Sequence, residues 1–210
     1  MTKLPSLALK NQRGFTLTEL LVSMGLSLFV LAGVGSVFRA QTHTVKGQES
    51  KMEANEYALT VLDMVVREVR NAGYFPSTPC PGGSITAASV SSITFQYDKN
   101  SSGTCGLVTD VDEQITFNFD GTNVTRTTTN PATTSTLTDD NATALAFTYY
   151  PQQTSATAPT AYSSPVASSS LALVQKITIS LTVAPKSTDS NFTGSPVTMS
   201  LTADLRNHGF

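Results

Sequence analysis

The sequence predicts an α+β protein: a long N-terminal α-helix, membrane-spanning in its first half, packed on an antiparallel β-sheet head. Three observations predict it. No proline interrupts the chain between Phe15 and Phe75, residues 20–38 form an uncharged apolar run, and short alternating segments with turn signals follow Pro81. The chain has 210 residues, enough for one such helix and one head of ordinary domain size.

The first segment is a basic leader that precedes the apolar run. Residues 1–14 contain Lys3, Lys10 and Arg13 and no acidic residue, so the positive-inside rule places them in the cytoplasm. About 20 apolar residues at about 1.5 Å per residue cover a hydrocarbon core of ~30 Å. Residues 15–38 are therefore expected to cross the membrane as a helix.

Glu19 is a lone carboxylate at the start of this apolar segment. A charge within a membrane span costs at least ~2.5 kcal/mol, so such a residue is functional by default. Gly14, Phe15 and Glu19 together resemble the type III prepilin signal of type IV pilins and pseudopilins, in which a basic leader ends in Gly and a Glu follows the next Phe by four residues. The resemblance implies that prepilin peptidase cleaves between Gly14 and Phe15 and methylates the new amino terminus of Phe15.

The resemblance also implies a role for Glu19 in subunit assembly, where its carboxylate meets the free amino terminus of a neighbouring subunit. The alternative is that Glu19 lies at the membrane–water interface and extends its carboxylate into water. A secretory signal peptide is a competing interpretation of the whole segment, with residues 32–36 as a small-residue cleavage site, but it leaves Glu19 unexplained. The apolar segment contains three glycines, Gly25, Gly33 and Gly35. They either allow another helix to approach closely or mark a place where the helix locally unfolds.

Residues 39–75 are expected to continue the helix with one apolar face. Apolar residues recur in steps of three and four, which is typical of a helix packed on a sheet: Ala54, Ala58, Val61, Val65, Val69 and Ala72. Gly73 and Pro76 end the pattern. A helix of about 59 residues would be about 88 Å long.

Residues 76–210 are expected to form a β-rich globular head. The alternating segments that predict strands are 85–87, 90–97, 113–119, 124–128, 145–150, 176–183 and 197–203. Asp120-Gly121 lies between two of them and predicts a β-hairpin, and the last two segments predict a second hairpin. Residues 152–170 are rich in Ser, Thr, Ala and Pro and predict a long loop.

Two stretches extend the resemblance into the head. Residues 57–74, which end in Arg-Asn-Ala-Gly-Tyr, resemble the helix end of PilW-type minor pilins; residues 138–150 resemble a strand of the same group and of J-type minor pseudopilins of type II secretion. The resemblance implies a minor pilin that initiates or caps type IV pilus assembly. The alternatives are a J-like pseudopilin and a pilus-tip adhesin that binds through loops such as residues 152–170.

The same resemblance implies the partners and the location. The partners would be prepilin peptidase, other minor and major pilins and the inner-membrane assembly platform. The protein would cross the inner membrane once with its head in the periplasm, and would then reach the pilus at the cell surface. Roles in motility and adhesion would follow from that location.

Cys80 and Cys105 are the two cysteines. In an oxidising compartment such a pair is typically a disulfide, and closing a loop of about 26 residues would stabilise the fold by roughly 3.5 kcal/mol. Their spacing matches neither a Cys-x-x-Cys motif nor a zinc site.

Charge and motifs exclude several function classes. The net charge is −2, and removal of the leader's three basic residues leaves ten basic and fifteen acidic residues, a net charge of −5. Nucleic-acid binding is not expected because it needs a clustered basic surface. No nucleophile lies at an interpretable spacing from His43 or His208, so neither an enzyme nor a cofactor is expected. Asp98-x-Asn100-x-Ser102-Gly103 is similar to the opening of a calcium loop but is also a common turn, and no metal site is predicted.

Overall fold

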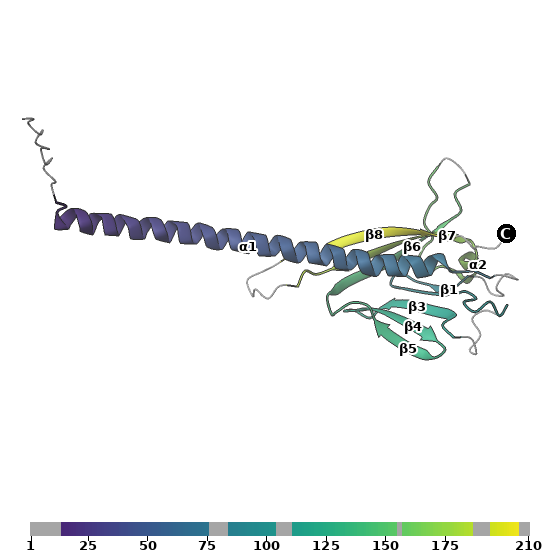
Figure 1. Cartoon of the computed structure of the whole chain (residues 1–210). Helices are drawn as coiled ribbons and strands as arrows, with labels where there is room; N and C mark the ends of the chain where they lie inside the picture. Colours follow the sequence, from purple (N-terminus) through teal and green to yellow (C-terminus); the bar gives the residue numbers. More distant parts are fainter. Residues whose placement is uncertain (1–13, 76–83, 104–110, 155–156, 187–193, 206–210) are drawn as a thin grey trace, which may run out of the picture. The chain divides into compact units, whose positions relative to one another are not determined.

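The computed structural model describes residues 14–75, 84–103, 111–154, 157–186 and 194–205. The elements in chain order are α1 (Leu17–Arg70), β1 (Ile85–Ala88), β2 (Ser92–Gln96), β3 (Gln114–Phe119), β4 (Val124–Thr129), β5 (Ala132–Thr136), β6 (Ala142–Pro151), α2 (Ser168–Leu171), β7 (Val174–Val183) and β8 (Val197–Asp204) (Figure 1). The chain divides into two compact units, residues 1–46 and 47–210. Each is described by itself.

The first unit is the N-terminal part of α1. Within the described residues, α1 is the one helix that is long and apolar enough to cross a membrane, and every side chain from Leu17 to Lys46 is exposed in the single chain. Five of its hydroxyls donate to backbone carbonyls three or four residues earlier: those of Ser23, Ser27, Ser36, Thr42 and Thr44. An internally bonded hydroxyl does not present an open donor to lipid, so these residues are compatible with the predicted membrane span.

The second unit contains the rest of α1 and two antiparallel sheets. The first sheet has the strand order β1-β2-β3-β4-β5 and the second has the order β6-β7-β8. Both predicted hairpins are present. In the first, Phe119 pairs with Val124 across the turn Asp120-Gly121. In the second, β7 and β8 pair antiparallel, with Val183 opposite Val197 at one end and Lys176 opposite Asp204 at the other. At the first turn Asp120 Oδ1 accepts the N–H groups of Thr122 and Asn123, at 2.9 and 2.7 Å. These donors hold the pKa of the Asp120 carboxyl below its usual value.

The predicted apolar face of α1 packs into the core of the second unit. All six residues of the predicted stripe are buried, and Leu62 and Val66 widen it. The strands contribute alternate residues, such as Phe95, Phe117 and Tyr149, each with no exposed surface. This confirms the predicted α+β arrangement, because the apolar faces of helix and sheets are buried together.

The outer face of the second sheet is lined by hydroxyl groups. Three pairs of residues on neighbouring strands β7 and β8 are joined by a hydrogen bond between their hydroxyl groups, with oxygen–oxygen distances of 3.3, 2.6 and 2.9 Å: Thr178–Thr202, Ser180–Ser200 and Thr182–Thr198. The alternate residues Ile177, Ile179 and Leu181 are fully buried on the other face. The period of two therefore explains both the core and the polar surface of this hairpin.

Two elements differ from the sequence-based expectation. β5 was not predicted, because Ala-Thr-Thr-Ser-Thr has no apolar alternation; all five residues are exposed at the sheet edge and pair with β4. The expected loop at residues 152–170 contains the start of α2, a single helical turn. The helix α1 ends at Arg70, and Gly73 follows with a φ of 76°, the left-handed conformation predicted for its stop.

Candidate functional site

The predicted processing residues lie together at the start of α1, in the first unit. Gly14 and Phe15 precede the helix, which begins at Leu17, and Glu19 lies in its first turn. All three are exposed, and the Phe15 side chain is 86 % accessible. The peptide bond between Gly14 and Phe15 is thus outside regular secondary structure and open to an enzyme.

Thr16 and Glu19 form a complete capping box. The Thr16 N–H donates to Glu19 Oε2 at 3.0 Å, and the Glu19 N–H donates to Thr16 Oγ1 at 3.3 Å. The Thr16 hydroxyl also donates to the same carboxylate oxygen at 3.1 Å. These bonds satisfy two backbone donors that the first turn of a helix leaves open. Glu19 therefore has a partner within its own chain.

Thr16 is a helix-capping residue that the sequence analysis missed. The signal was present as Thr16-Leu-Thr-Glu19, a Thr-x-x-Glu motif directly before an apolar run. The motif was assigned to processing alone, although it also predicts where the helix begins.

Gly14 has no structural reason within this chain to be glycine. A Cβ added there would meet no heavy atom within 4 Å, and its φ lies outside the left-handed region. A methyl group at this position would thus fit the folded chain, so any requirement for glycine comes from a molecule that binds here.

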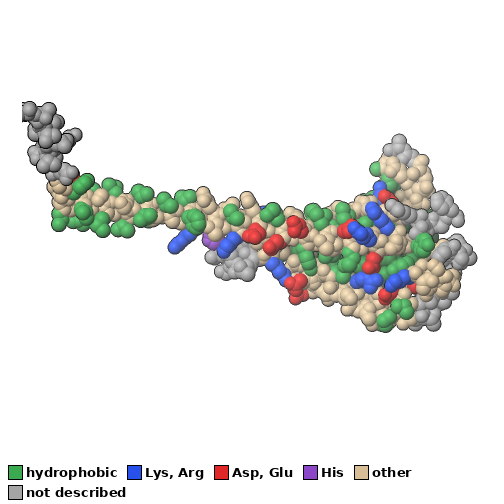
Figure 2. Space-filling model, in the orientation of Figure 1, with side chains coloured by type: hydrophobic (Ala, Val, Ile, Leu, Met, Phe, Trp, Pro, Cys, Tyr) green, Lys and Arg blue, Asp and Glu red, His purple; other side chains and the backbone are tan. Residues whose placement is uncertain are grey.

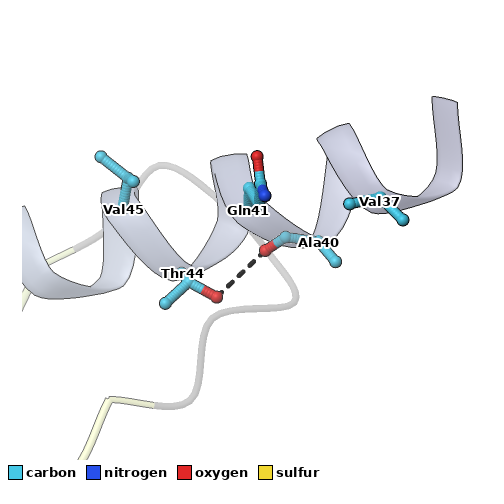
Figure 3. A pocket seen from close by; sticks show the side chains of 5 residues that line it. All are labelled: Val37, Ala40, Gln41, Thr44 and Val45. Atoms are coloured by element: carbon cyan, nitrogen blue, oxygen red, sulfur yellow. Dashed lines mark hydrogen bonds between the residues drawn. The ribbon is translucent and has the colours of Figure 1, made fainter. Parts of the chain in front are cut away.

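Hydrophobic side chains cover the N-terminal part of α1, and charged side chains gather farther along the helix (Figure 2). One pocket lies against α1, and the described residues that line it are Val37, Ala40, Gln41, Thr44 and Val45 (Figure 3). The Thr44 hydroxyl donates to Ala40 O at 3.0 Å. Among the described residues, the lining thus offers apolar contacts and one amide, and no charged group that could orient a ligand.

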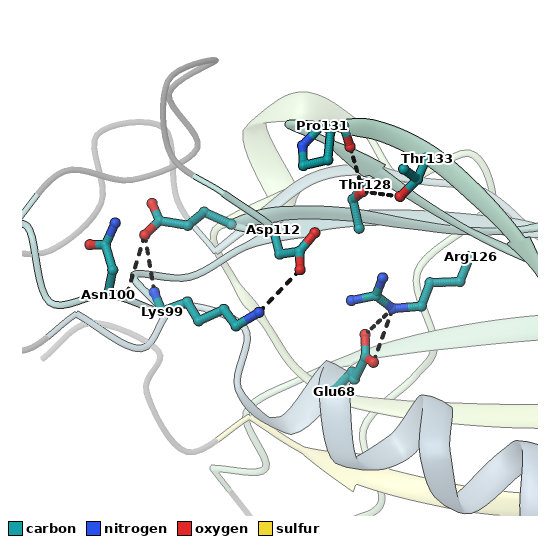
Figure 4. A network of polar contacts seen from close by, with 9 residues as sticks. Glu68, Lys99, Asn100, Asp112, Arg126, Thr128, Pro131 and Thr133 are labelled. Carbon is teal, nitrogen blue, oxygen red and sulfur yellow. Dashed lines mark hydrogen bonds and ion pairs between the residues drawn. The ribbon is translucent and has the colours of Figure 1, made fainter.

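In the second unit a polar cluster lies at the C-terminal end of α1 (Figure 4). Arg126 Nε of β4 donates to both carboxylate oxygens of Glu68, at 2.9 and 3.0 Å. These two side chains are 20 % and 24 % exposed, in contrast to the Asp63–Arg67 pair, whose acid and base are 53 % and 75 % exposed. The partly buried Glu68–Arg126 pair thus links the helix to the sheet.

The loop that was compared with a calcium site is held by its own backbone. Asp98 is fully buried, and its two oxygens accept the N–H groups of Ser102 and Gly103 at 3.0 and 2.9 Å. Asn100 Oδ1 accepts the Ser102 N–H at 2.8 Å. No cluster of three or more potential metal-binding side chains is present among the described residues. The loop geometry is that of a turn.

Cys80, Cys105 and His208 lie outside the described residues. The described residues that flank the two cysteine segments nevertheless meet at Asp98. The Asp98 N–H donates to Tyr74 O at 2.9 Å, and the Gly103 N–H donates to Asp98 Oδ2. Both segments therefore leave the described chain at the same corner of the second unit.

Comparison with known proteins returned two family matches. The family described as "Prepilin peptidase-dependent protein B" matches residues 48–208, which is more than half of the chain, and the "Prokaryotic N-terminal methylation motif" matches residues 9–35. The searches of curated proteins and of solved structures found no match.

Proposed function

Because the chain belongs to the prepilin peptidase-dependent protein B family and carries the N-terminal methylation motif, we propose that it is a minor pilin that initiates or caps type IV pilus assembly. Membership of this family implies processing by the peptidase. The proposal adds that cleavage follows Gly14, that Phe15 is methylated, and that the protein has a structural rather than an enzymatic role.

The observation that carries the proposal is the continuity of α1. One helix contains both the apolar segment after the cleavage motif and the amphipathic segment that packs on the sheets. Such a subunit can leave the membrane only by transferring its apolar segment to another apolar environment. A bundle of equivalent helices in a filament provides one.

In this proposal Glu19 changes partner during assembly. In the single chain its carboxylate accepts two bonds from Thr16. In the filament it would meet the amino terminus of a neighbouring Phe15, and opposite charges in a low-dielectric bundle attract strongly. Glu19→Gln keeps one acceptor for the capping box but removes the charge, and is therefore expected to be cleaved but not assembled.

Intact-mass spectrometry tests the processing step. The full chain would be expressed in hosts with and without prepilin peptidase and purified from membranes. A chain that begins at methylated Phe15 only in the host with the peptidase supports the proposal. Cleavage near Gly35, or no cleavage in either host, would contradict it.

The phenotype of a deletion strain distinguishes a minor pilin from a pseudopilin and from an adhesin. Deletion of the gene should reduce the number of surface pili if the protein is a PilW-type minor pilin whose head reaches the periplasm and then the pilus. Loss of protein secretion with normal pili would instead identify a J-like pseudopilin. Normal pilus number with lost surface attachment would identify an adhesin.

A further inference from the structure

Two cationic side chains lie on the same face of α1 directly after the apolar run. Arg39 is the first residue after Phe38, and Lys46 follows seven residues later. Seven residues are close to two full turns, so the two positions differ by only about 20° around the helix. Both side chains are exposed, and Figure 2 shows basic and histidine side chains on one side of the helix just beyond its hydrophobic part. Arg39 and Lys46 are here called the cation pair.

The sequence around the cation pair contains no opposite charge on the side of the apolar run. No acidic residue lies between Glu19 and Glu49. The stretch that begins at the end of the apolar run is therefore cationic, and acidic residues appear only after Lys46. A ligand that meets this stretch from the side of the apolar run should carry negative charge.

The direction of helical side chains brings the cation pair toward the predicted membrane span. In an α-helix each side chain points back toward the N-terminus, which in α1 is the side of the apolar run. Lys46 lies eight residues after Phe38, about 12 Å along a helix. The headgroup layer of a bilayer is about 5–8 Å thick on each side, and a long cationic side chain bridges such a remaining distance. Both cations are thus within reach of lipid phosphate.

The number of cations beyond the span is unusual for the predicted orientation. An excess of Lys and Arg normally marks the cytoplasmic side of a membrane helix. The leader contributes three basic residues, and residues 39–51 contribute three as well. Cations on the far side oppose the predicted orientation, and a favourable contact with anionic lipid on that side would offset this effect.

Processing makes the charge distribution one-sided. Removal of residues 1–14 takes away every Lys and Arg before Phe38 and leaves Glu19 as the only charged side chain in residues 15–38. In the processed chain the cations nearest to the span then all lie beyond Phe38. A contact between lipid phosphate and the cation pair therefore remains after the leader is removed.

We propose that Arg39 and Lys46 bind the phosphate groups of anionic phospholipids at the outer surface of the inner membrane. Charge complementarity and the position of both cations directly after the apolar run select this occupant. The Arg39 guanidinium can donate two N–H groups to one phosphate, whereas the Lys46 ammonium acts as a point charge. The inference rests on the proposed function, because it concerns the processed subunit in the membrane before assembly.

Native mass spectrometry of the processed full chain tests the lipid contact. The protein would be purified from a host with prepilin peptidase and placed in nanodiscs with equal amounts of phosphatidylglycerol and phosphatidylcholine. Attraction of about fivefold for each cation predicts that phosphatidylglycerol adducts exceed phosphatidylcholine adducts at least fivefold. Equal amounts of the two adducts would overturn the proposal.

Matched variants locate the contact. Arg39→Gln/Lys46→Gln should bring the adduct ratio to about one and leave the unfolding temperature unchanged, because both side chains are exposed. Lys46→Gln alone should lower the ratio at least twofold. Lys51→Gln removes the same charge from another exposed position, 13 residues or about 20 Å after Phe38, and should leave the ratio unchanged. Equal losses in Lys46→Gln and Lys51→Gln would show that total charge alone selects the lipid, which contradicts the proposal.

A further arm separates lipid phosphate from free phosphate. Inorganic phosphate in tenfold excess over phosphatidylglycerol should leave the adduct ratio unchanged, because acyl chains hold only the lipid phosphate at the depth of the cation pair. Replacement of the lipid adducts by phosphate adducts would assign the cation pair to a soluble anion and overturn the lipid contact.

The outcomes distinguish the lipid contact from the proposed function. Cleavage after Gly14 and normal pili, together with equal adducts of the two lipids, remove the lipid contact and leave the function standing. Absence of cleavage after Gly14 removes the function, and with it the processed subunit on which the lipid contact rests.

Discussion

At the scale of single residues, we predict that Gly14 is required by the peptidase rather than by the fold. Because a Cβ there meets no atom within 4 Å, Gly14→Ala should leave the thermal unfolding of the chain unchanged. One added methyl in an enzyme pocket costs about tenfold or more in rate, so the uncleaved precursor should accumulate to a corresponding extent. Intact-mass spectrometry over time measures it.

The control for this prediction is Gly25→Ala. Gly25 also has open space around its Cα, but it lies inside the helix and away from the cleavage site. Cleavage of this variant should proceed at the wild-type rate. An equal loss of cleavage in both variants would show that the helix, and not the peptidase site, is the sensitive feature.

Tyr149 shows the opposite case, a residue required by the core. Its side chain is fully buried, and its hydroxyl donates to Ser89 O and Ser92 O at 2.9 and 3.2 Å. Burial raises the pKa of this phenol well above its usual value of about 10. Tyr149→Phe should cost about 1 kcal/mol of unfolding free energy at neutral pH, because the Ser89 carbonyl loses this donor, whereas Ser92 O still accepts the N–H of Ser89 at 2.8 Å.

The pH dependence of Tyr149 has a definite sign. Its pKa is raised in the folded state, so its contribution to stability is complete below about pH 10 and falls as the pH rises further, since the unfolded phenol then ionises. The difference between wild type and Tyr149→Phe should therefore shrink above pH 10. Thermal unfolding between pH 8 and 11 measures it, and a difference that is constant or grows would contradict the assignment.

At the scale of elements, the Glu68–Arg126 pair joins α1 to β4. Both side chains are three-quarters or more buried, so the removal of one partner leaves the other charge poorly solvated. Glu68→Gln should lower the unfolding free energy by about 1–3 kcal/mol, or roughly 2–10 °C in Tm.

The same helix offers a matched control for this pair. Asp63→Asn breaks the exposed Asp63–Arg67 pair and should cost about 0.5 kcal/mol or less. A double-mutant cycle with Arg126→Met isolates the interaction of Glu68 with Arg126. Equal effects of Glu68→Gln and Asp63→Asn would show that the partly buried pair does not hold the helix on the sheet.

At the scale of the whole molecule, we predict that Cys80 and Cys105 form a disulfide. The described residues beside both segments are joined through Asp98, so the two segments start from one corner. Reduction should then lower the unfolding free energy by roughly 3.5 kcal/mol, because the closed loop restricts the unfolded chain.

Thiol titration and thermal unfolding with and without reductant check the disulfide. The Cys80→Ser/Cys105→Ser variant should be insensitive to reductant and should match the reduced wild type in stability. Two titratable thiols in the purified, unreduced protein would refute the prediction.

Local patterns in the sequence were sufficient for the long helix, its buried stripe, both hairpins and the processing motif. These features depend on residues that are close in the chain: the step of three and four for Ala54 to Ala72, the Asp120-Gly121 turn, and the spacing of Gly14, Phe15 and Glu19. The Thr16–Glu19 capping box was also readable, because its four residues are contiguous.

Only the tertiary structure decided how the strands divide between two sheets, that β5 exists, and that Glu68 meets Arg126 across 58 positions of sequence. It also decided which apolar residues of α1 stay exposed: Leu62 and Val66 are buried, whereas Met52 and Leu59 are not. The physical reason is the same in each case. Periodicity determines which residues share a face of one element, but burial depends on which distant element packs against that face.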